Sequence, residues 1–126
     1  MRARRAITAL ATDAAAVLVF VAAGRRSHEE GLTVLGIART AAPFLLGLGA
    51  GWLATRAWRA PASLSTGLGV WAATAAGGLV LRALVFGDGV APAFVVVAIC
   101  ALGLLLVGWR LAARALRPGR ADLGLE

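Results

Sequence analysis

The chain has 126 residues, of which 60% are hydrophobic and 15% charged, and its net charge at pH 7 is +7. A water-soluble domain of this size cannot bury so much apolar surface, so the composition excludes a soluble globular protein. The arginines lie mostly in short segments between long apolar runs, a pattern typical of basic residues at anionic lipid headgroups and not of a nucleic-acid groove. The single cysteine, Cys100, excludes an intrachain disulfide and a cysteine-based metal site.

Four apolar runs are each long enough to cross a hydrocarbon core of about 30 Å at about 1.5 Å per residue. They predict membrane-spanning helices over residues of about 6–24, 32–55, 64–86 and 90–109, followed by a short polar tail over 113–126. The expected fold is all-α, an integral membrane four-helix bundle that forms a single transmembrane domain over residues 1–126. A cleaved signal peptide is the alternative interpretation of the first run, but Asp13 would interrupt its apolar centre and no secreted domain follows.

The distribution of arginines predicts the orientation of the bundle, because basic residues in short loops favour the cytoplasmic side. Nine arginines fall on one side of the expected spans: Arg2, Arg4, Arg5, Arg56, Arg59, Arg110, Arg114, Arg117 and Arg120. The loops on the other side contain only Arg25 and Arg26. We therefore expect a plasma-membrane protein with both termini in the cytoplasm. Trp52, Trp58 and Trp109 lie near the same cytoplasmic boundary, where indole rings prefer to sit.

Small residues at four-residue spacing allow helices to approach closely in lipid. The second expected span contains Gly47 and Gly51 at this spacing, and the third contains Gly69, Ala73 and Gly77. These stripes predict a tightly packed bundle, and an unused stripe would also permit self-association.

Pro43 lies about halfway along the second expected span. It cannot donate a hydrogen bond to the carbonyl of Arg39, so a kink is expected there. Two interpretations stay open. The proline is either an ordinary one of the kind that membrane helices tolerate, or the freed carbonyl and the Arg39 side chain line a polar pocket.

Asp13, Arg39 and Arg82 are the ionisable residues that fall inside the expected spans. A charge at the bilayer centre costs at least about 2.5–3.5 kcal/mol, so such groups are expected to face protein or water and to pair. Asp13 lies about 10 Å from the cytoplasmic end and Arg39 about 10 Å from the outer edge, a gap that a long arginine side chain can largely close. We therefore expect an Asp13–Arg39 pair, and we expect Arg82 to extend to the outer headgroups.

This pair has three open interpretations. It is a structural ion pair that fixes the register of the helices, or a proton or ion site in which the partner of Asp13 switches. In the third interpretation Asp13 faces another protein.

Several short motifs resemble those of one family. They are Asp13-x6-Phe20-x3-Gly24-Arg25-x2-His28, Thr40-x2-Pro43-Phe44, Leu81-Arg82 and Gly108-Trp109-Arg110. From about Asp13 to Arg110 the chain resembles the bacterial membrane proteins called domain-of-unknown-function family 3054. The resemblance implies a small four-span protein, commonly of actinobacteria and their relatives, with no established activity. It also implies that some of these pattern positions share a polar site, namely Asp13, Arg25, His28, Pro43, Phe44 and Arg82.

The candidate polar site of the sequence comprises Asp13, Arg25, His28, Arg39, Pro43 and Arg82. The sequence has no lysine for a Schiff base, and its single histidine cannot supply two axial haem ligands. We expect a non-enzymatic structural or accessory membrane protein that has no catalytic residues, cofactor or metal. Its expected partners are the lipid bilayer and either a second copy of the chain or another membrane protein, and nucleic acid is not expected.

Two alternatives to this function stay open. One is a small ion- or proton-coupled transporter component that uses Asp13 and Arg39. The other is a membrane enzyme that acts on lipid headgroups through His28 together with Arg25 and Arg82.

Reporter fusions after Arg26 and at the C-terminus are predicted to report opposite sides of the membrane, because one expected span precedes the first site and four precede the second. Alkaline phosphatase activity and green fluorescence, which are produced on different sides, measure this directly. The same side at both sites would contradict four spans.

Overall fold

The computed structural model contains four long α-helices and describes residues 2–27, 30–87 and 89–116. The helices are α1 (Arg2–Ser27), α2 (Val34–Thr55), α3 (Leu64–Leu84) and α4 (Pro92–Ala115), with a 3₁₀ turn, η1 (Ala57–Arg59), between α2 and α3. Each of the four is long and apolar enough to cross a membrane, and the described residues contain no strand. The predicted all-α fold with four membrane-span-like helices is therefore confirmed.

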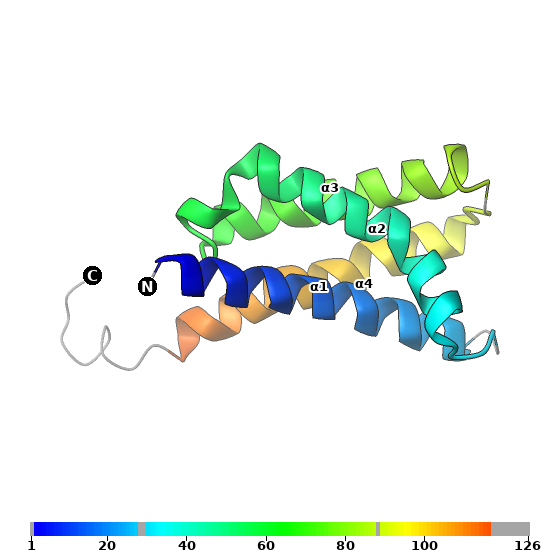
Figure 1. Ribbon diagram of the computed structural model, residues 1–126, viewed down its shortest axis with the longest axis horizontal. Helices are drawn as coiled ribbons and strands as arrows, with labels where there is room; N and C mark the ends of the chain where they lie inside the picture. The colour runs from blue at the N-terminus through cyan, green and yellow to red at the C-terminus, as the bar shows by residue number, and fades with distance from the viewer. Residues whose placement is uncertain (1, 28–29, 88, 117–126) are drawn as a thin grey trace.

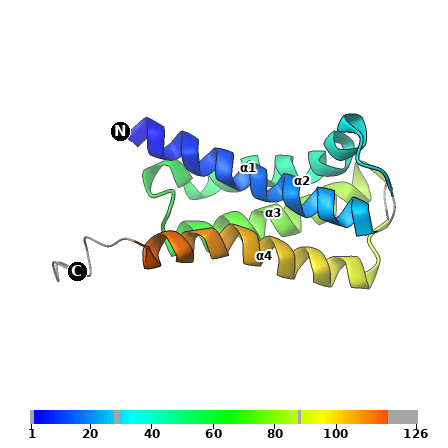
Figure 2. The same ribbon diagram turned by 90° about the horizontal axis from the view of Figure 1, so that it is seen from below.

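The bundle has two ends, which are called the closed end and the open end below. At the closed end the first turn of α1 and the last turn of α4 lie beside η1 (Figure 1). At the open end α1 connects to α2 and α3 connects to α4 (Figure 1). Seen from below, α1 and α4 lie nearest the viewer, over the pair formed by α2 and α3 (Figure 2).

Capping residues set where the helices begin. The Thr33 hydroxyl accepts a hydrogen bond from the backbone N–H of Gly36 at 3.0 Å, and the Ser63 hydroxyl accepts one from Thr66 at 3.2 Å. Both are N-cap interactions, which satisfy amide groups that have no partner within the helix. Pro92 lies at the first position of α4, where its missing N–H is not needed.

The helix bounds differ from the expected spans at several ends. α1 begins already at Arg2, and α3 ends at Leu84, before the expected boundary. α4 begins at Pro92 and continues to Ala115, so Arg110 lies inside a helix and not just beyond its end. Hydropathy marks the apolar part of a helix, whereas backbone hydrogen bonding continues into its polar flanks, which explains why α1 begins earlier and α4 ends later than expected.

α2 and α3 form the most extensive contact between any two elements. A Cβ atom placed on Gly47 would lie 3.0 Å from the carbonyl oxygen of Ala73 and 3.0 Å from the amide nitrogen of Gly78. One turn later, a Cβ atom on Gly51 would lie 2.8 Å from the Cβ of Ala73. The two backbones thus approach too closely for any side chain, which confirms the close packing predicted from the Gly47 and Gly51 stripe.

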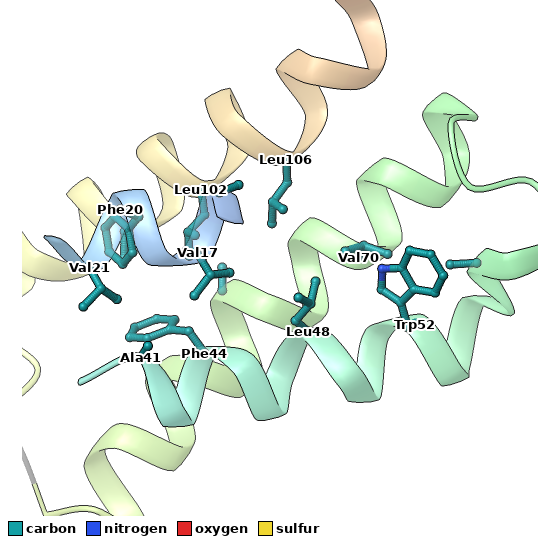
Figure 3. Packing of buried hydrophobic residues seen from close by; sticks show 14 of the residues in the cluster. Val17, Phe20, Val21, Ala41, Phe44, Leu48, Trp52, Val70, Leu102 and Leu106 are labelled. Carbon is teal, nitrogen blue, oxygen red and sulfur yellow. The ribbon is translucent and has the colours of Figure 1, made fainter. Parts of the chain in front are cut away.

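Buried apolar side chains from all four helices fill the centre of the bundle (Figure 3). Val17 of α1, Phe44 of α2, Val70 of α3 and Leu102 of α4 are all fully buried. In lipid the benefit of this packing comes from close van der Waals contact and not from removing apolar surface from water. The core therefore depends on shape more than on hydrophobicity.

Gly47→Leu is predicted to destabilise the bundle by about 1–3 kcal/mol, because the new side chain would push against the backbone of α3. The matched control is Gly49→Leu on the same helix, where a Cβ atom meets nothing within 4 Å. The thermal stability of both variants is measured as the loss of monomeric protein on heating in detergent. Equal thermal stability of the two variants would contradict this packing.

Candidate functional site

Asp13 of α1 is fully buried, and four N–H groups donate hydrogen bonds to its carboxylate. Oδ1 accepts from Trp109 Nε1 and Arg110 Nη1, and Oδ2 accepts from Trp52 Nε1 and Arg110 Nη2, each at 2.8 Å. We call Asp13, Trp52, Trp109 and Arg110 the Asp13 clamp. Because these residues come from α1, α2 and α4, the clamp ties three helices together at the closed end.

Arg110 is as completely buried as the carboxylate that it binds. Its two parallel hydrogen bonds to Asp13 form a bidentate ion pair, the strongest geometry for this pair of groups. Nε also donates to the carbonyl of Pro61 at 2.8 Å, and Nη1 donates to that of Leu106 at 3.0 Å. Gly67 of α3 makes room for the side chain, since a Cβ there would lie 2.5 Å from Arg110 Cδ.

Each buried side-chain nitrogen and oxygen of the clamp has a hydrogen-bond partner. Among the described residues, no buried side-chain nitrogen or oxygen lacks a hydrogen-bond partner. Removing two charges from water costs several kcal/mol per ion, and only complete hydrogen bonding offsets that cost. A carboxylate that accepts four hydrogen bonds and is closed to solvent is therefore suited to holding helices together.

The expected Asp13–Arg39 pair is wrong, because Arg110 is the partner of Asp13, with an Nη2–Oδ2 distance of 2.8 Å. Arg39 is exposed on α2 and lies near the open end of the bundle, whereas Asp13 and Arg110 both approach from the closed end. Trp52, which was expected near the cytoplasmic boundary, is only 7% exposed and donates to Asp13, so its indole belongs to the clamp.

The sequence contained a signal for the true partner. Asp13 was placed about 10 Å from the cytoplasmic end of its span. Trp109 and Arg110 end the apolar run of the fourth span at that same side of the membrane. Counting depth from one common side would therefore have favoured Arg110 over Arg39, which enters from the opposite side.

A cavity of about 540 Å³ lies at the open end of the bundle. Its apolar wall includes three aromatic rings, one each from α1, α2 and α4: Phe20, Phe44 and Phe94. The centroid of Phe20 lies 5.5 Å from that of Phe44, in an edge-to-face arrangement, and 6.3 Å from that of Phe94. Figure 3 shows how Phe20 and Phe44 point toward each other.

Arg25, on the last turn of α1, is one of two arginines that line this cavity. Its guanidinium donates to the carbonyls of Gly31 and Glu30, at 2.9 and 2.7 Å, and to the hydroxyl of Thr40 at 2.9 Å. The Glu30 carboxylate lies 3.6 Å from Nη1 of the same arginine. Arg25 thus fastens the connection between α1 and α2.

Arg82, near the end of α3, is the second arginine of the cavity. Nε donates to the carbonyl of Gly89 at 2.9 Å, and the guanidinium carbon lies 4.6 Å from the centroid of the Phe94 ring. The side chain therefore stacks on an aromatic face, a cation–π contact. It lies over the wall of the cavity, and its expected extension to the outer headgroups stays a prediction.

The structure does not bring the six candidate residues into one site. Arg25 and Arg82 share the open-end cavity, whereas Asp13 belongs to the clamp at the other end. Pro43 is buried inside α2, and its expected kink stays a prediction. His28 lies outside the described residues. Within the described ranges, no three His, Cys, Asp or Glu side chains are grouped so that they could hold a metal ion.

Asp13→Asn and Arg110→Gln are each predicted to destabilise the bundle by about 3–5 kcal/mol, because each leaves one buried charge without its partner. The double variant is predicted to recover much of that loss, since it leaves no charge in the clamp. The free energy of unfolding in detergent, measured for all four members of the cycle, gives the coupling. Arg114→Gln, an exposed position on the same helix, is the control and should have little effect. Additive losses in the double variant would contradict the clamp.

The comparisons with known proteins agree with the motifs quoted from the sequence. No curated protein and no solved structure matches the chain. A family model described as "Protein of unknown function (DUF3054)" matches residues 10–113, which include both the clamp and the described residues of the cavity. Because this match covers most of the chain, the protein belongs to the DUF3054 family.

Proposed function

We propose that this protein is a non-enzymatic, multi-pass component of the bacterial plasma membrane, a structural or accessory subunit with both termini in the cytoplasm. The observation that carries the proposal is the saturated carboxylate of Asp13, which is fully buried and accepts four hydrogen bonds. A group so enclosed holds helices in register and has no face left for a substrate.

The same observation bears on the transport hypothesis, which needs Asp13 and Arg39 to exchange partners. Asp13 is bound through both oxygens to Arg110, so the exchange would have to break a buried bidentate pair. Breaking such a pair costs about 3–5 kcal/mol, which opposes repeated switching. The geometry therefore favours a fixed scaffold.

The proposed orientation is supported by the arginines that remain outside the clamp. Arg110 is buried and no longer counts toward the cytoplasmic side. The other arginines assigned to that side still outnumber Arg25 and Arg26 on the other. The positive-inside rule therefore still places the closed end toward the cytoplasm.

If the protein is an accessory subunit, detergent should extract it together with a partner at a fixed molar ratio. The full chain, tagged and extracted from its native membrane in mild detergent, should migrate with another membrane protein or with a second copy of itself. Quantitative mass spectrometry of the purified complex measures the ratio. Recovery of the chain alone, as a monodisperse 12.8 kDa protomer, would contradict the accessory role.

Proteoliposomes that contain the full chain supply the complementary test. No proton flux above that of empty vesicles is expected, either for the unchanged protein or for the Asp13→Asn/Arg110→Gln double variant. A flux that the folded double variant loses and the Arg114→Gln control keeps would overturn the scaffold in favour of transport.

A further inference from the structure

The cavity at the open end is too large for a simple ion. At about 540 Å³ it falls in the range of sites that hold organic ligands, which is about 300–1,000 Å³. Its wall combines aromatic and aliphatic side chains with two guanidinium groups. A small anion alone would leave the apolar wall uncovered, so the occupant that fits has both an anionic group and an apolar part.

The charges of the cavity favour one negative group. The described ionisable residues that line it are Arg25, Arg82 and Glu30. The Glu30 carboxylate lies 3.6 Å from Arg25 and offsets its charge, whereas no described carboxylate lies within ion-pair distance of Arg82. Among the described ionisable groups of the cavity, one cationic charge is therefore left for a ligand, and it is complementary to a group with a single negative charge.

The geometry of Arg82 leaves suitable donors. Among the described residues its one hydrogen-bond acceptor is the carbonyl of Gly89, which binds Nε. Stacking on Phe94 occupies the face of the guanidinium, so the N–H groups of Nη1 and Nη2 lie in its plane and can still donate. Two such N–H groups match two oxygens of a phosphate.

Polar and apolar parts of the cavity lie at different depths. Along α1, Phe20 precedes Arg25 by five residues, which places the aromatic wall about 7.5 Å deeper in the bundle than the arginine. Val97 of α4 lines the cavity and is 56% exposed, so the cavity is open to its surroundings beside α4. A ligand whose phosphate lies near the arginines would therefore have room for an attached acyl chain along Phe20 and Val97.

We infer that the open-end cavity binds a phospholipid of the surrounding bilayer, with the phosphodiester at Arg82 and Arg25 and an acyl chain against the aromatic wall. A phosphodiester carries one negative charge, and its attached chains supply the apolar part that the wall requires. This inference does not depend on the accessory role, since a scaffold, an isolated protein or an enzyme could each hold a lipid.

The test titrates palmitoyl-oleoyl phosphatidylglycerol into the detergent-solubilised full chain and counts bound lipid by native mass spectrometry. One lipid per chain is expected. The diacylglycerol with the same chains lacks the phosphate, and glycerol 3-phosphate lacks the chains, so both should bind about tenfold or more weakly. Equal binding of the diacylglycerol would overturn the role of the arginines. If glycerol 3-phosphate binds as tightly as phosphatidylglycerol, the ligand is a soluble phosphate and the lipid assignment is overturned.

Arg82→Gln is expected to weaken phosphatidylglycerol binding by about tenfold or more, because it removes the donors and the charge. The matched control is Arg26→Gln, an exposed arginine at the same end that does not line the cavity. Equal losses in the two variants would overturn a defined site, since they would show a general attraction between cations and lipid.

Ala93→Trp tests the same site without changing any charge. Ala93 lines the cavity, so an indole there should fill part of the space for the lipid and weaken binding while both arginines remain. This variant keeps the inference testable even if Arg82→Gln does not fold. Unchanged binding in folded Ala93→Trp would overturn the placement of the lipid.

Discussion

The ion pair between Asp13 and Arg110 is the constraint around which the closed end is arranged. Neither charge reaches solvent, so each must find its partners inside the protein. Two indole N–H groups complete the carboxylate, and the carbonyls of Pro61 and Leu106 complete the guanidinium. α1, α2 and α4 cannot shift along their axes without leaving one of these groups unpaired, which makes the pair a determinant of register.

The open end uses its arginines differently. Arg25 and Arg82 each donate to backbone carbonyls in the connections between helices, so they stabilise loops and not the core of the bundle. Arg82 also covers an aromatic ring, and it lines a cavity. One small bundle thus contains a sealed polar cluster at one end and a polar cluster that lines a cavity at the other.

The fold could be predicted largely from the sequence, because spans must match the thickness of a hydrocarbon core and the four apolar runs do. That Asp13 is buried also followed from its place in such a run. Its partner did not, because Arg110 was assigned to a loop from the end of the apolar run, and α4 continues beyond it. The cavity could not be predicted from the sequence for another reason. It depends on which faces of α1, α3 and α4 pack together, and hydropathy does not determine this.

The clamp joins the first helix of the chain to the last, with 97 positions between the two charges. During synthesis at about 5–20 residues per second, the carboxylate is therefore made about 5–20 s before its guanidinium partner exists. In that interval the nascent α1 carries an acidic group without its partner, and this group has to stay in contact with water or with the insertion machinery. Assembly of the closed end is thus obliged to wait for α4, however early α1, α2 and α3 enter the bilayer.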